Sequence, residues 1–319
     1  MANGAILNQK KANPQLSNLT NTQQALYNIG AGVRQNLLIN PFFKVNQRGE
    51  SLYTIDTPQY TVDCWKATGT FSSCSVGYSN DYLLIFNGSR TLGISQYIEN
   101  YQALAGKTVT LSFLADITSG NYKVTLDDGT VHSSSGFPSG GKQLYSFSYE
   151  ISSAPSELRC SFESVAGAQA KIYAAKLEIG NNQTLAYQNV NGDWQLLEQP
   201  DPNEILKCYR YQYVPVGEDN SYPNASGFAF SASQGRFIFP MPVPMRIAPT
   251  LSYLNGATIN TFQIFKPAGG AASSVTSIPT IRNTPSGIGI IANTSGLTAN
   301  TPICLRSTIS TPILFDANL

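Results

Sequence analysis

The sequence contains few of the side chains on which enzyme chemistry usually depends. Among its 319 residues His132 is the only histidine, and it stands beside serines in Thr130-Val-His-Ser-Ser-Ser. A serine or cysteine nucleophile needs a neighbouring base, and a lone histidine in such a setting is more often a surface residue. No Gly-x-Ser-x-Gly, P-loop or Gly-x-Gly-x-x-Gly pattern occurs. These observations argue against nucleophilic and nucleotide-dependent catalysis.

Glycan cleavage would require two carboxylates held ~5–10 Å apart. Between Asn220 and Leu319 the only carboxylate is Asp316, so this part of one chain cannot supply the pair. The preceding residues offer candidates, but strand alternation places most of them at solvent-facing positions or in turns. They are Asp63, Asp81, Glu99, Asp116, Asp127, Asp128, Glu163 and Glu178. We therefore expect a protein that is not an enzyme and needs no cofactor.

Recognition of a glycan fits the composition better. Aromatic rings stack on the C–H faces of sugars, while amides, hydroxyls and arginines bond the sugar hydroxyls. The chain has 17 Tyr and 15 Phe, and most of these rings must form the core. Trp65, inside an alternating segment, is expected to be structural.

Five residues in loops or beside turns are candidates for glycan contacts. They are Tyr222, Tyr253, Arg282, Asn283 and Trp194. The first four belong to the last third of the chain. Trp194 has an equally good alternative, which is packing between two domains.

The net charge of +1 and the 12% of charged residues limit the kinds of partner. Nucleic acids and anionic membranes are poor partners, because their binders concentrate Lys and Arg on one face. After residue 220, five cations accompany the single carboxylate Asp316. This mildly cationic end either favours an anionic surface polymer or is a neutral β-domain with solvated arginines, and the second interpretation is favoured.

The five cysteines are odd in number and widely spaced, which argues against a disulfide framework or a zinc site. Buried free thiols are the favoured interpretation, with a Cys64–Cys74 bridge across a hairpin as the alternative. The N-terminus has no secretory signal and no segment approaches the length of a membrane span. We therefore expect synthesis in the cytoplasm.

Short alternating segments separated by Gly, Asn, Ser and Asp predict an all-β protein. Residues 36–49 are predicted to be an edge-lying opening strand and turn. About nine strands between residues 36 and 187, the first of them at 61–66, indicate a two-sheet jelly roll. Residues 191–202 are predicted to be a linker and 204–211 a short helix. A second, smaller β-sandwich follows from residue 228.

Residues 1–35 are predicted to hold one short helix, in Gln23-Gln-Ala-Leu-Tyr-Asn, that ends at Gly30-Ala-Gly32. Such a short helix is marginal on its own. Its role as an attachment or oligomerising element is implied by the family resemblance given below. The predicted organisation is thus an attachment segment at 1–35, a jelly roll at 36–190, a linker at 191–202 and a C-terminal β-sandwich at 203–319.

Several short sequence motifs of this chain resemble motifs of one protein family and occur in the same order as in that family. Asn36-Leu-Leu-Ile-Asn-Pro-Phe-Phe, Asn46-Gln-Arg-Gly49, Tyr60-Thr-Val-Asp-Cys-Trp65 and Cys208-Tyr-Arg-Tyr211 are similar to phrases of phage and prophage tail-fibre or receptor-binding proteins with a jelly roll like that of carbohydrate-binding modules. The resemblance implies attachment to other tail or baseplate proteins through the N-terminal segment, a homotrimer, and a location in a virion tail or phage-tail-like particle. It also leaves open a structural calcium ion near Asn40, Glu50 and Glu178.

The resemblance and the composition together predict a non-enzymatic tail-fibre protein that recognises a host cell-surface glycan, with the C-terminal sandwich as the receptor-binding tip. Two alternatives stay open. One is a purely structural tail or baseplate subunit, and the other is a polysaccharide-degrading tailspike.

Overall fold

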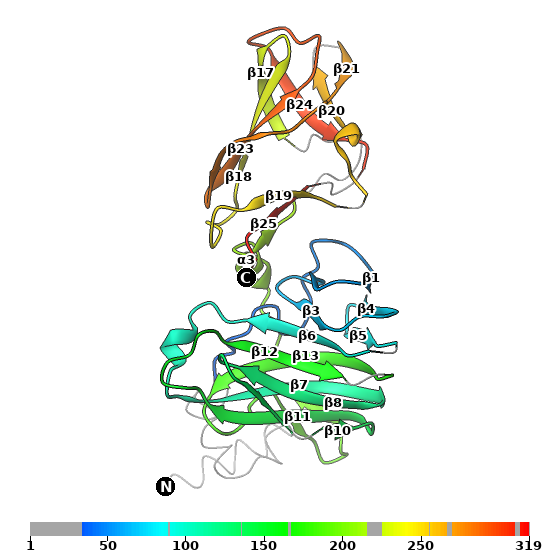
Figure 1. Cartoon of the computed structure of the whole chain (residues 1–319), viewed down its shortest axis with the longest axis vertical. Coiled ribbons are helices and arrows are strands. Elements are labelled where there is room, and N and C mark those ends of the chain that lie inside the picture. Colours follow the sequence, from blue (N-terminus) through cyan, green and yellow to red (C-terminus); the bar gives the residue numbers. More distant parts are fainter. Residues whose placement is uncertain are drawn as a thin grey trace. The chain divides into compact units, whose positions relative to one another are not determined.

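The computed structural model describes residues 34–88, 90–134, 136–164, 167–215, 225–254, 256–266, 270–309 and 313–318 (Figure 1). The predicted N-terminal helix and attachment segment therefore lie outside the described residues. The chain divides into two compact units. The first comprises Met1–Lys44 and Glu50–Pro202, and the second comprises Val45–Gly49 and Asn203–Leu319.

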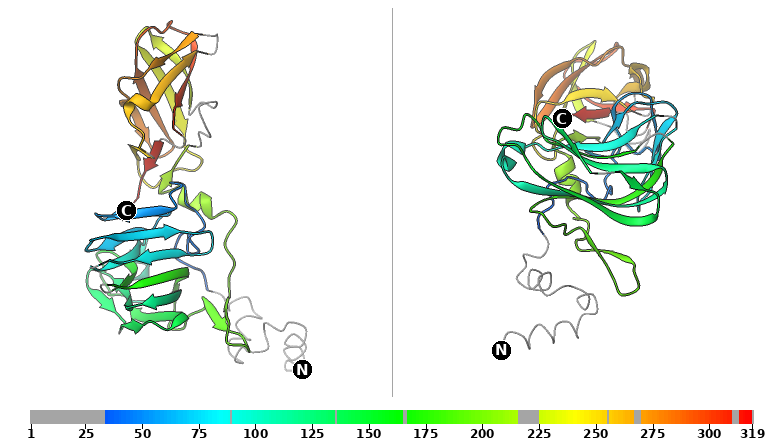
Figure 2. Two further views of the ribbon diagram at one scale, coloured as in Figure 1. Left: turned by 90° about the vertical axis from the view of Figure 1, so that its right-hand side faces the viewer. Right: turned by 60° about the horizontal axis from the view of Figure 1, so that its bottom comes forward.

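The first unit is a jelly roll of two antiparallel sheets (Figures 1 and 2). The six-stranded sheet has the order β1 (Leu52–Ile55), β4 (Cys74–Tyr78), β5 (Leu83–Phe86), β13 (Gln169–Ile179), β7 (Thr108–Ser119) and β11 (Gly141–Glu150). The seven-stranded sheet has the order β10 (Phe137–Pro138), β8 (Asn121–Asp127), β12 (Arg159–Ser164), β6 (Leu92–Tyr97), β3 (Lys66–Gly69) and β2 (Gln59–Tyr60), with β9 (Val131–Ser133) beside β8. A short 3-10 helix, η2 (Tyr101–Leu104), precedes β7.

Strand alternation places the core between these two sheets. In β7, Val109, Leu111 and Phe113 are fully buried, as expected for a strand with one face inward. Trp65 is also fully buried, and its Nε1 donates a hydrogen bond to the carbonyl oxygen of Asn40 at 2.9 Å. The prediction that Trp65 is structural is confirmed.

The opening segment is not the predicted strand. Residues 36–49 form bends and turns, and Asn40 and Phe43 have φ angles of 52° and 57°, which a strand cannot contain. The segment instead follows β13, with hydrogen bonds from Leu37 N to Leu177 O at 2.8 Å and from Ala175 N to Pro41 O at 2.8 Å. Pro41 and the positive φ angles explain why alternation misled the prediction.

The strand predicted at residues 61–66 is also wrong. Only Lys66 belongs to a strand, and a tight turn closes with a hydrogen bond from Trp65 N to Val62 O at 3.0 Å. Cys64 in this turn has a φ angle of 67°. The turn orients Trp65 into the core.

The second unit is a smaller all-β body with two sheets around a separate core. Its three-stranded sheet has the order β16 (Gln212–Tyr213), β25 (Ile313–Asp316) and β19 (Thr250–Tyr253). Its seven-stranded sheet has the order β21 (Gly270–Ser274), β20 (Phe262–Lys266), β24 (Pro302–Ser307), β17 (Ala225–Ser231), β18 (Gln234–Pro240), β23 (Gly287–Asn293) and β22 (Thr280–Thr284). The all-β fold, with a jelly roll followed by a smaller sandwich, is confirmed.

Two short helices complete the second unit. The helix predicted at residues 204–211 is shorter than expected, because α3 ends at Cys208 (Glu204–Cys208) and a turn follows it. A 3-10 turn, η3 (Ile259–Thr261), leads into β20. None of the helices in the described ranges is both long and apolar enough to cross a membrane.

A five-residue segment from the first half of the sequence belongs to the second unit. The side-chain amide of Gln47 donates to Gln212 O at 3.0 Å and accepts from Val214 N at 3.1 Å. Arg48 Nη2 lies 3.0 Å from Gln212 Oε1 and 3.8 Å from Asp316 Oδ2. The phrase Asn46-Gln-Arg-Gly49 therefore has a structural role, which is to bind β16 and β25.

The five cysteines are free thiols, so the Cys64–Cys74 alternative is wrong. Four are buried and Cys304 is half-buried. Burial raises the pKa of the Cys160 thiol well above its ordinary value, which keeps it protonated and unreactive.

Candidate functional site

A hairpin covers part of the outer face of the six-stranded sheet. It consists of β14 (Ala186–Gln188) and β15 (Trp194–Leu196), so the segment predicted as a linker contains a strand. Beneath it lies a small apolar cluster on the face of the sheet that is turned away from the main core. Its buried members are Phe42, Leu114, Ala174, Leu185 and Ala186.

A bulge in β13 determines which side chains reach this outer face. The register with β7 shifts between Ile172 and Ala174, so Tyr173 is the extra residue. Ile172 packs in the main core before the shift, and Ala175 and Leu177 do so after it. Lys176 and Glu178 consequently face the hairpin.

These two charged side chains are buried and bonded beneath the hairpin. Lys176 is fully buried, and its Nζ lies 2.8 Å from Glu198 Oε2. Glu178 accepts hydrogen bonds from the backbone N–H of Thr184 at 2.5 Å and from its hydroxyl at 2.6 Å. Burial raises the pKa of Glu178, although the bonds from Thr184 and the charge of Lys176 oppose that shift. The polar network thus holds residues 184–198 against the sheet.

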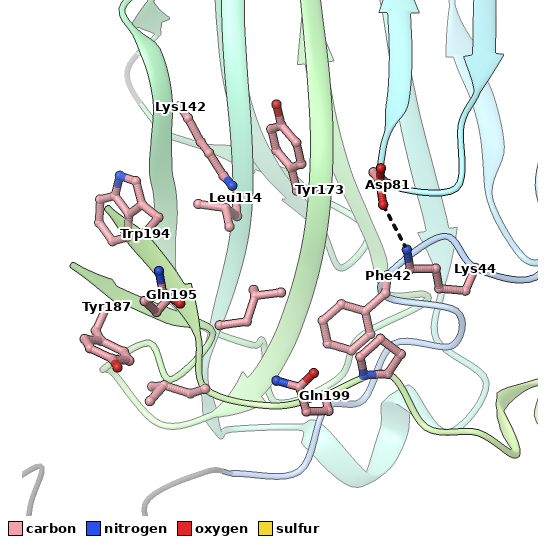
Figure 3. Close-up of a pocket in the computed structure, with 13 residues that line it drawn as sticks. Phe42, Lys44, Asp81, Leu114, Lys142, Tyr173, Tyr187, Trp194, Gln195 and Gln199 are labelled. Carbon is pink, nitrogen blue, oxygen red and sulfur yellow. Dashed lines mark ion pairs between the residues drawn. The ribbon is translucent and has the colours of Figure 1, made fainter. Parts of the chain in front are cut away.

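An open pocket of about 710 Å³ lies beside the hairpin (Figure 3). The hairpin contributes Tyr187 and Trp194, and the sheet contributes Tyr173, Leu114 and Lys142. The other lining residues are Phe42, Lys44, Asp81, Gln195, Leu196, Leu197, Gln199 and Pro200. The pocket therefore combines aromatic rings with amide and charged groups, all from the first unit.

Tyr173 is central to the sheet side of the pocket. The Nζ of Lys142 lies 4.2 Å from the centroid of its ring, a cation–π distance, and the ring of Tyr82 lies 5.8 Å away edge-on. Burial first, and then the charge of Asp116 and the neighbouring Tyr82, raise the pKa of Tyr173. Its phenol is therefore a neutral hydrogen-bonding group at physiological pH.

The remaining polar groups of the pocket differ in what they already bind. Lys44 Nζ lies 3.8 Å from Asp81 Oδ1, so these two charges offset each other. The indole Nε1 of Trp194 is buried and has no hydrogen-bond partner among the described residues. Gln195 and Gln199 add amide donors and acceptors at the rim (Figure 3).

The structure brings one of the five predicted glycan-contact residues into this pocket. Trp194 lines it and packs against the apolar cluster of the first unit. Tyr222 lies outside the described residues. Tyr253, Arg282 and Asn283 belong to the second unit, in strands rather than in loops.

These three residues lie in two different sheets, Tyr253 in the three-stranded sheet and Arg282 and Asn283 in the seven-stranded sheet. Tyr253 is 39% exposed in β19 and lies 5.6 Å from the ring of Phe262, and burial raises its pKa. Asn283 donates its side-chain amide to Pro249 O at 2.5 Å. Arg282 is exposed on β22.

The analysis of the sequence missed Tyr173, Tyr187 and Lys142. Simple alternation in β13 cannot indicate where Tyr173 points, because the bulge changes the face of every later residue. The one available signal was the crowding of aromatic residues and glutamines between residues 187 and 199.

His132 and the calcium candidates Asn40 and Glu178 have structural partners. Asn40 donates its side-chain amide to Asp63 O at 3.0 Å, and Glu178 accepts the hydrogen bonds from Thr184 described above. The ring of His132 stacks on Tyr149 at 3.7 Å, and its Nε2 lies 3.3 Å from Asp128 Oδ1. Burial opposes ionisation of Asp128, but hydrogen bonds from Ser152 and Thr130 and the nearby His132 lower its pKa overall. In the part of the chain that the structure describes, no three His, Cys, Asp or Glu residues cluster as a metal site.

No family model matches the chain, and no curated protein matches its sequence. Among solved structures, the enzymatically active domain of tailspike protein 4 of bacteriophage CBA120 is 14% identical, with a TM-score of 0.32. That match covers 46% of this chain and 21% of the tailspike chain, so this protein is similar to about a fifth of it.

Two carbohydrate-binding structures are similarly distant. A family 61 carbohydrate-binding module in complex with β-1,4-galactotriose is 16% identical, with a TM-score of 0.33 over 46% of this chain and 99% of the module. The family 22 and glycoside hydrolase modules of Clostridium thermocellum xylanase 10B, in complex with xylohexaose, are 11% identical, with a TM-score of 0.31 over 49% of this chain and 30% of that one. Matches this distant do not transfer a ligand or an activity.

Proposed function

We propose that this chain is a non-enzymatic receptor-binding protein of a phage or phage-tail-like particle, and that the pocket beside the hairpin binds a host cell-surface glycan. The observation that carries the proposal is the grouping of Tyr173, Tyr187 and Trp194 around one open pocket of about 710 Å³. Aromatic faces of this kind suit the C–H surfaces of sugar rings.

The polar groups of the pocket support recognition of hydroxyl groups. Gln195 and Gln199 can donate and accept hydrogen bonds, and the phenol of Tyr187 can do both.

The carboxylates of the pocket favour binding over cleavage. Asp81 is the one carboxylate among its lining residues, and Lys44 lies beside it. Glycan hydrolysis by two carboxylates needs a second one about 5–10 Å away. This observation supports a binding protein rather than a polysaccharide-degrading tailspike.

The proposed assembly follows from the sequence resemblance. We infer a homotrimer that attaches to tail or baseplate proteins through residues 1–35 and is located in a virion tail or phage-tail-like particle. Three copies of a weak site would bind a cell surface with strongly increased avidity. Sedimentation of the purified full-length chain tests the trimer, with a monomer as the contradicting result.

The pocket is tested with full-length protein and intact cells of candidate bacterial hosts. Trp194→Ala and Tyr187→Ala each remove one ring, and we expect each to weaken cell binding roughly tenfold, or about 1.4 kcal/mol. Phe86→Ala is the matched control, because Phe86 is a 45% exposed ring on the same sheet that does not line the pocket.

Three other outcomes would contradict this proposal. Equal binding by Trp194→Ala, Tyr187→Ala and the unchanged protein would exclude the pocket as the receptor site. Failure of the unchanged, fully assembled protein to bind any host would favour a structural tail or baseplate subunit. Release of reducing ends from host polysaccharide would establish a tailspike.

A further inference from the structure

The outer face of the seven-stranded sheet in the second unit exposes large apolar side chains. Phe228 and Phe230 of β17 are 47% and 48% exposed, and Ile238 of β18 is 72% exposed. Their strand neighbours Ala229 and Phe237 are buried in the core, so alternation places the exposed set on the opposite face. An exposed apolar group of this size on neighbouring strands is typical of a binding surface.

Two arginines lie on the same face. Arg236 pairs in register with Phe228, and its guanidinium lies 3.5 Å from the centroid of the Phe230 ring. Its Nε is buried and has no hydrogen-bond partner within the described ranges. The guanidinium is thus held over an aromatic ring.

The second arginine, Arg282, lies on the edge strand β22. Gly289 of β23 stands in register between Ile238 and Arg282. A Cβ added at Gly289 would meet Ile281 Cγ1 at 3.4 Å and Arg282 Cβ at 3.6 Å, which places both residues over the outer face. Ile281 is 50% exposed, so an exposed apolar side chain again lies next to an arginine on this face.

The strands that form this face contain no acidic residue that could neutralise the two arginines. No Asp or Glu occurs from residue 220 to residue 315. Asp316 lies in the three-stranded sheet beside Arg48, at 3.8 Å, and Glu204 lies 2.8 Å from Lys207. The other two acids of this unit, Glu218 and Asp219, lie outside the described residues. Among the described residues the charge of this face is therefore positive, and its complement is an anion.

We propose that the outer face of the seven-stranded sheet binds an anionic polysaccharide. Phe228 would stack on a sugar ring and Phe230 would hold Arg236 in place, while Arg236 and Arg282 would bond the carboxylate, phosphate or sulfate groups that the polymer carries. This proposal goes beyond the receptor pocket, because it concerns another unit and another class of glycan. It does not depend on that pocket.

Charge also argues against two other occupants. A second copy of the same face would bring Arg236 and Arg282 against like charges. A nucleic acid carries a phosphate every ~3.4 Å of each strand, which is far denser than the arginines of this sheet. Widely spaced charges between sugar rings fit the arrangement better.

The experiment compares dextran sulfate with neutral dextran of the same length, using the full-length chain and calorimetry. We expect binding of dextran sulfate only, and a loss of at least about tenfold in the double variant Arg236→Gln and Arg282→Gln. Phe228→Ser with Phe230→Ser should also weaken binding, because the rings supply contacts that the charge does not replace.

A control variant carries Arg90→Gln and Lys107→Gln, which remove two exposed charges from the first unit. We expect it to bind dextran sulfate within about twofold of the unchanged chain, as should Trp194→Ala. The proposal is overturned if this control loses as much affinity as the arginine variant, or if the unchanged chain does not bind.

Two further results would assign the face to another partner. Tighter binding of a single-stranded oligonucleotide with the same number of charges would indicate a nucleic acid. Concentration-dependent association that Phe228→Ser with Phe230→Ser abolishes would indicate a second copy of the chain. Either result contradicts the polysaccharide proposal and leaves the test of the Trp194 pocket unaffected.

Discussion

The outer face of the six-stranded sheet in the first unit and that of the seven-stranded sheet in the second unit differ in how charged and apolar side chains are covered. In the first unit the hairpin covers part of the six-stranded sheet, so Leu114 is buried and Lys176 is bonded to Glu198. In the second unit Phe230 is about half exposed and Arg236 lies over its ring. Similar strand patterns thus produce a stabilised, partly closed face in one unit and an open, cationic face in the other.

The largest expected effect tests the closed face. Glu198→Ala leaves the buried ammonium of Lys176 without its carboxylate and should lower the free energy of unfolding of the first unit by about 3 kcal/mol. We take the lower end of the usual range because the Glu198 side chain is 17% exposed. Urea unfolding monitored by tryptophan fluorescence measures the change.

The matched change on the open face is Arg236→Gln. It removes a charge that has no buried counter-ion, so we expect a change within about 0.5 kcal/mol in the unfolding of the second unit. Equal losses from Glu198→Ala and Arg236→Gln would contradict the contrast between the two faces.

A second pair of variants compares apolar side chains. Leu114→Ala removes a side chain beneath the hairpin that is 1% exposed, and should cost about 2–3 kcal/mol. Phe230→Ala removes a ring that is 48% exposed and should cost less than about 1 kcal/mol. Thermal unfolding by calorimetry measures both, and a larger loss from Phe230→Ala would show that the second face is covered in solution.

A smaller effect should appear in the pH dependence of the first unit. The pKa of Glu178 in the folded chain is raised above its ordinary value of 4.5. The contribution of this shift to stability is therefore complete below the ordinary, unfolded-state pKa, and it is lost as the pH rises through the folded-state pKa. Glu178→Gln keeps an acceptor oxygen for the backbone N–H of Thr184 but does not titrate. Its stability relative to the unchanged chain should therefore increase with pH from about pH 4.5 upward.

Urea titrations of both proteins between pH 4 and pH 7 provide that comparison. A constant difference across the series would mean that the Glu178 pKa is not raised. Asn36→Ala is a useful second variant, because it removes the side-chain hydrogen bonds to Glu198, Ala175, Leu38 and Leu177 without changing a titrating group.

The smallest expected effect concerns Ser112, which faces the hairpin beside Lys176. Its hydroxyl is buried and has no hydrogen-bond partner among the described residues. Ser112→Ala removes the cost of burying that group, so we expect stability to be unchanged or raised by up to about 1 kcal/mol. A loss above 1 kcal/mol would indicate an ordered water that bonds the hydroxyl.

The sequence indicated the all-β fold well, because alternation in segments such as Val109 to Phe113 follows directly from one buried sheet face. It failed where the backbone leaves that period. Positive φ angles at Asn40, Phe43 and Cys64 turned two predicted strands into turns, and the bulge at Tyr173 reassigned the faces of β13. Of the five predicted contact residues, only Trp194 lines the pocket.

The pocket could not be predicted for a related reason. It needs β11, β13 and the β14–β15 hairpin together, and their pairing is set by contacts far apart in the sequence. The cationic face was easier to anticipate, since the lack of acids from residue 220 to residue 315 is visible without a structure. The exposure of Phe228 and Phe230 was not.

The insertion of residues 45–49 into the second unit has a consequence for folding order. Gln47 contacts Gln212, which is 165 residues later in the sequence, and Arg48 contacts the same residue 164 positions later. Arg48 also contacts Asp316, so these contacts cannot form before those residues are synthesised. During synthesis the first unit can fold early, whereas this second set of contacts forms only after Asp316 has left the ribosome. A nonsense mutation even a few codons before Asp316 would therefore remove a partner of the N-terminal half as well as the last strand.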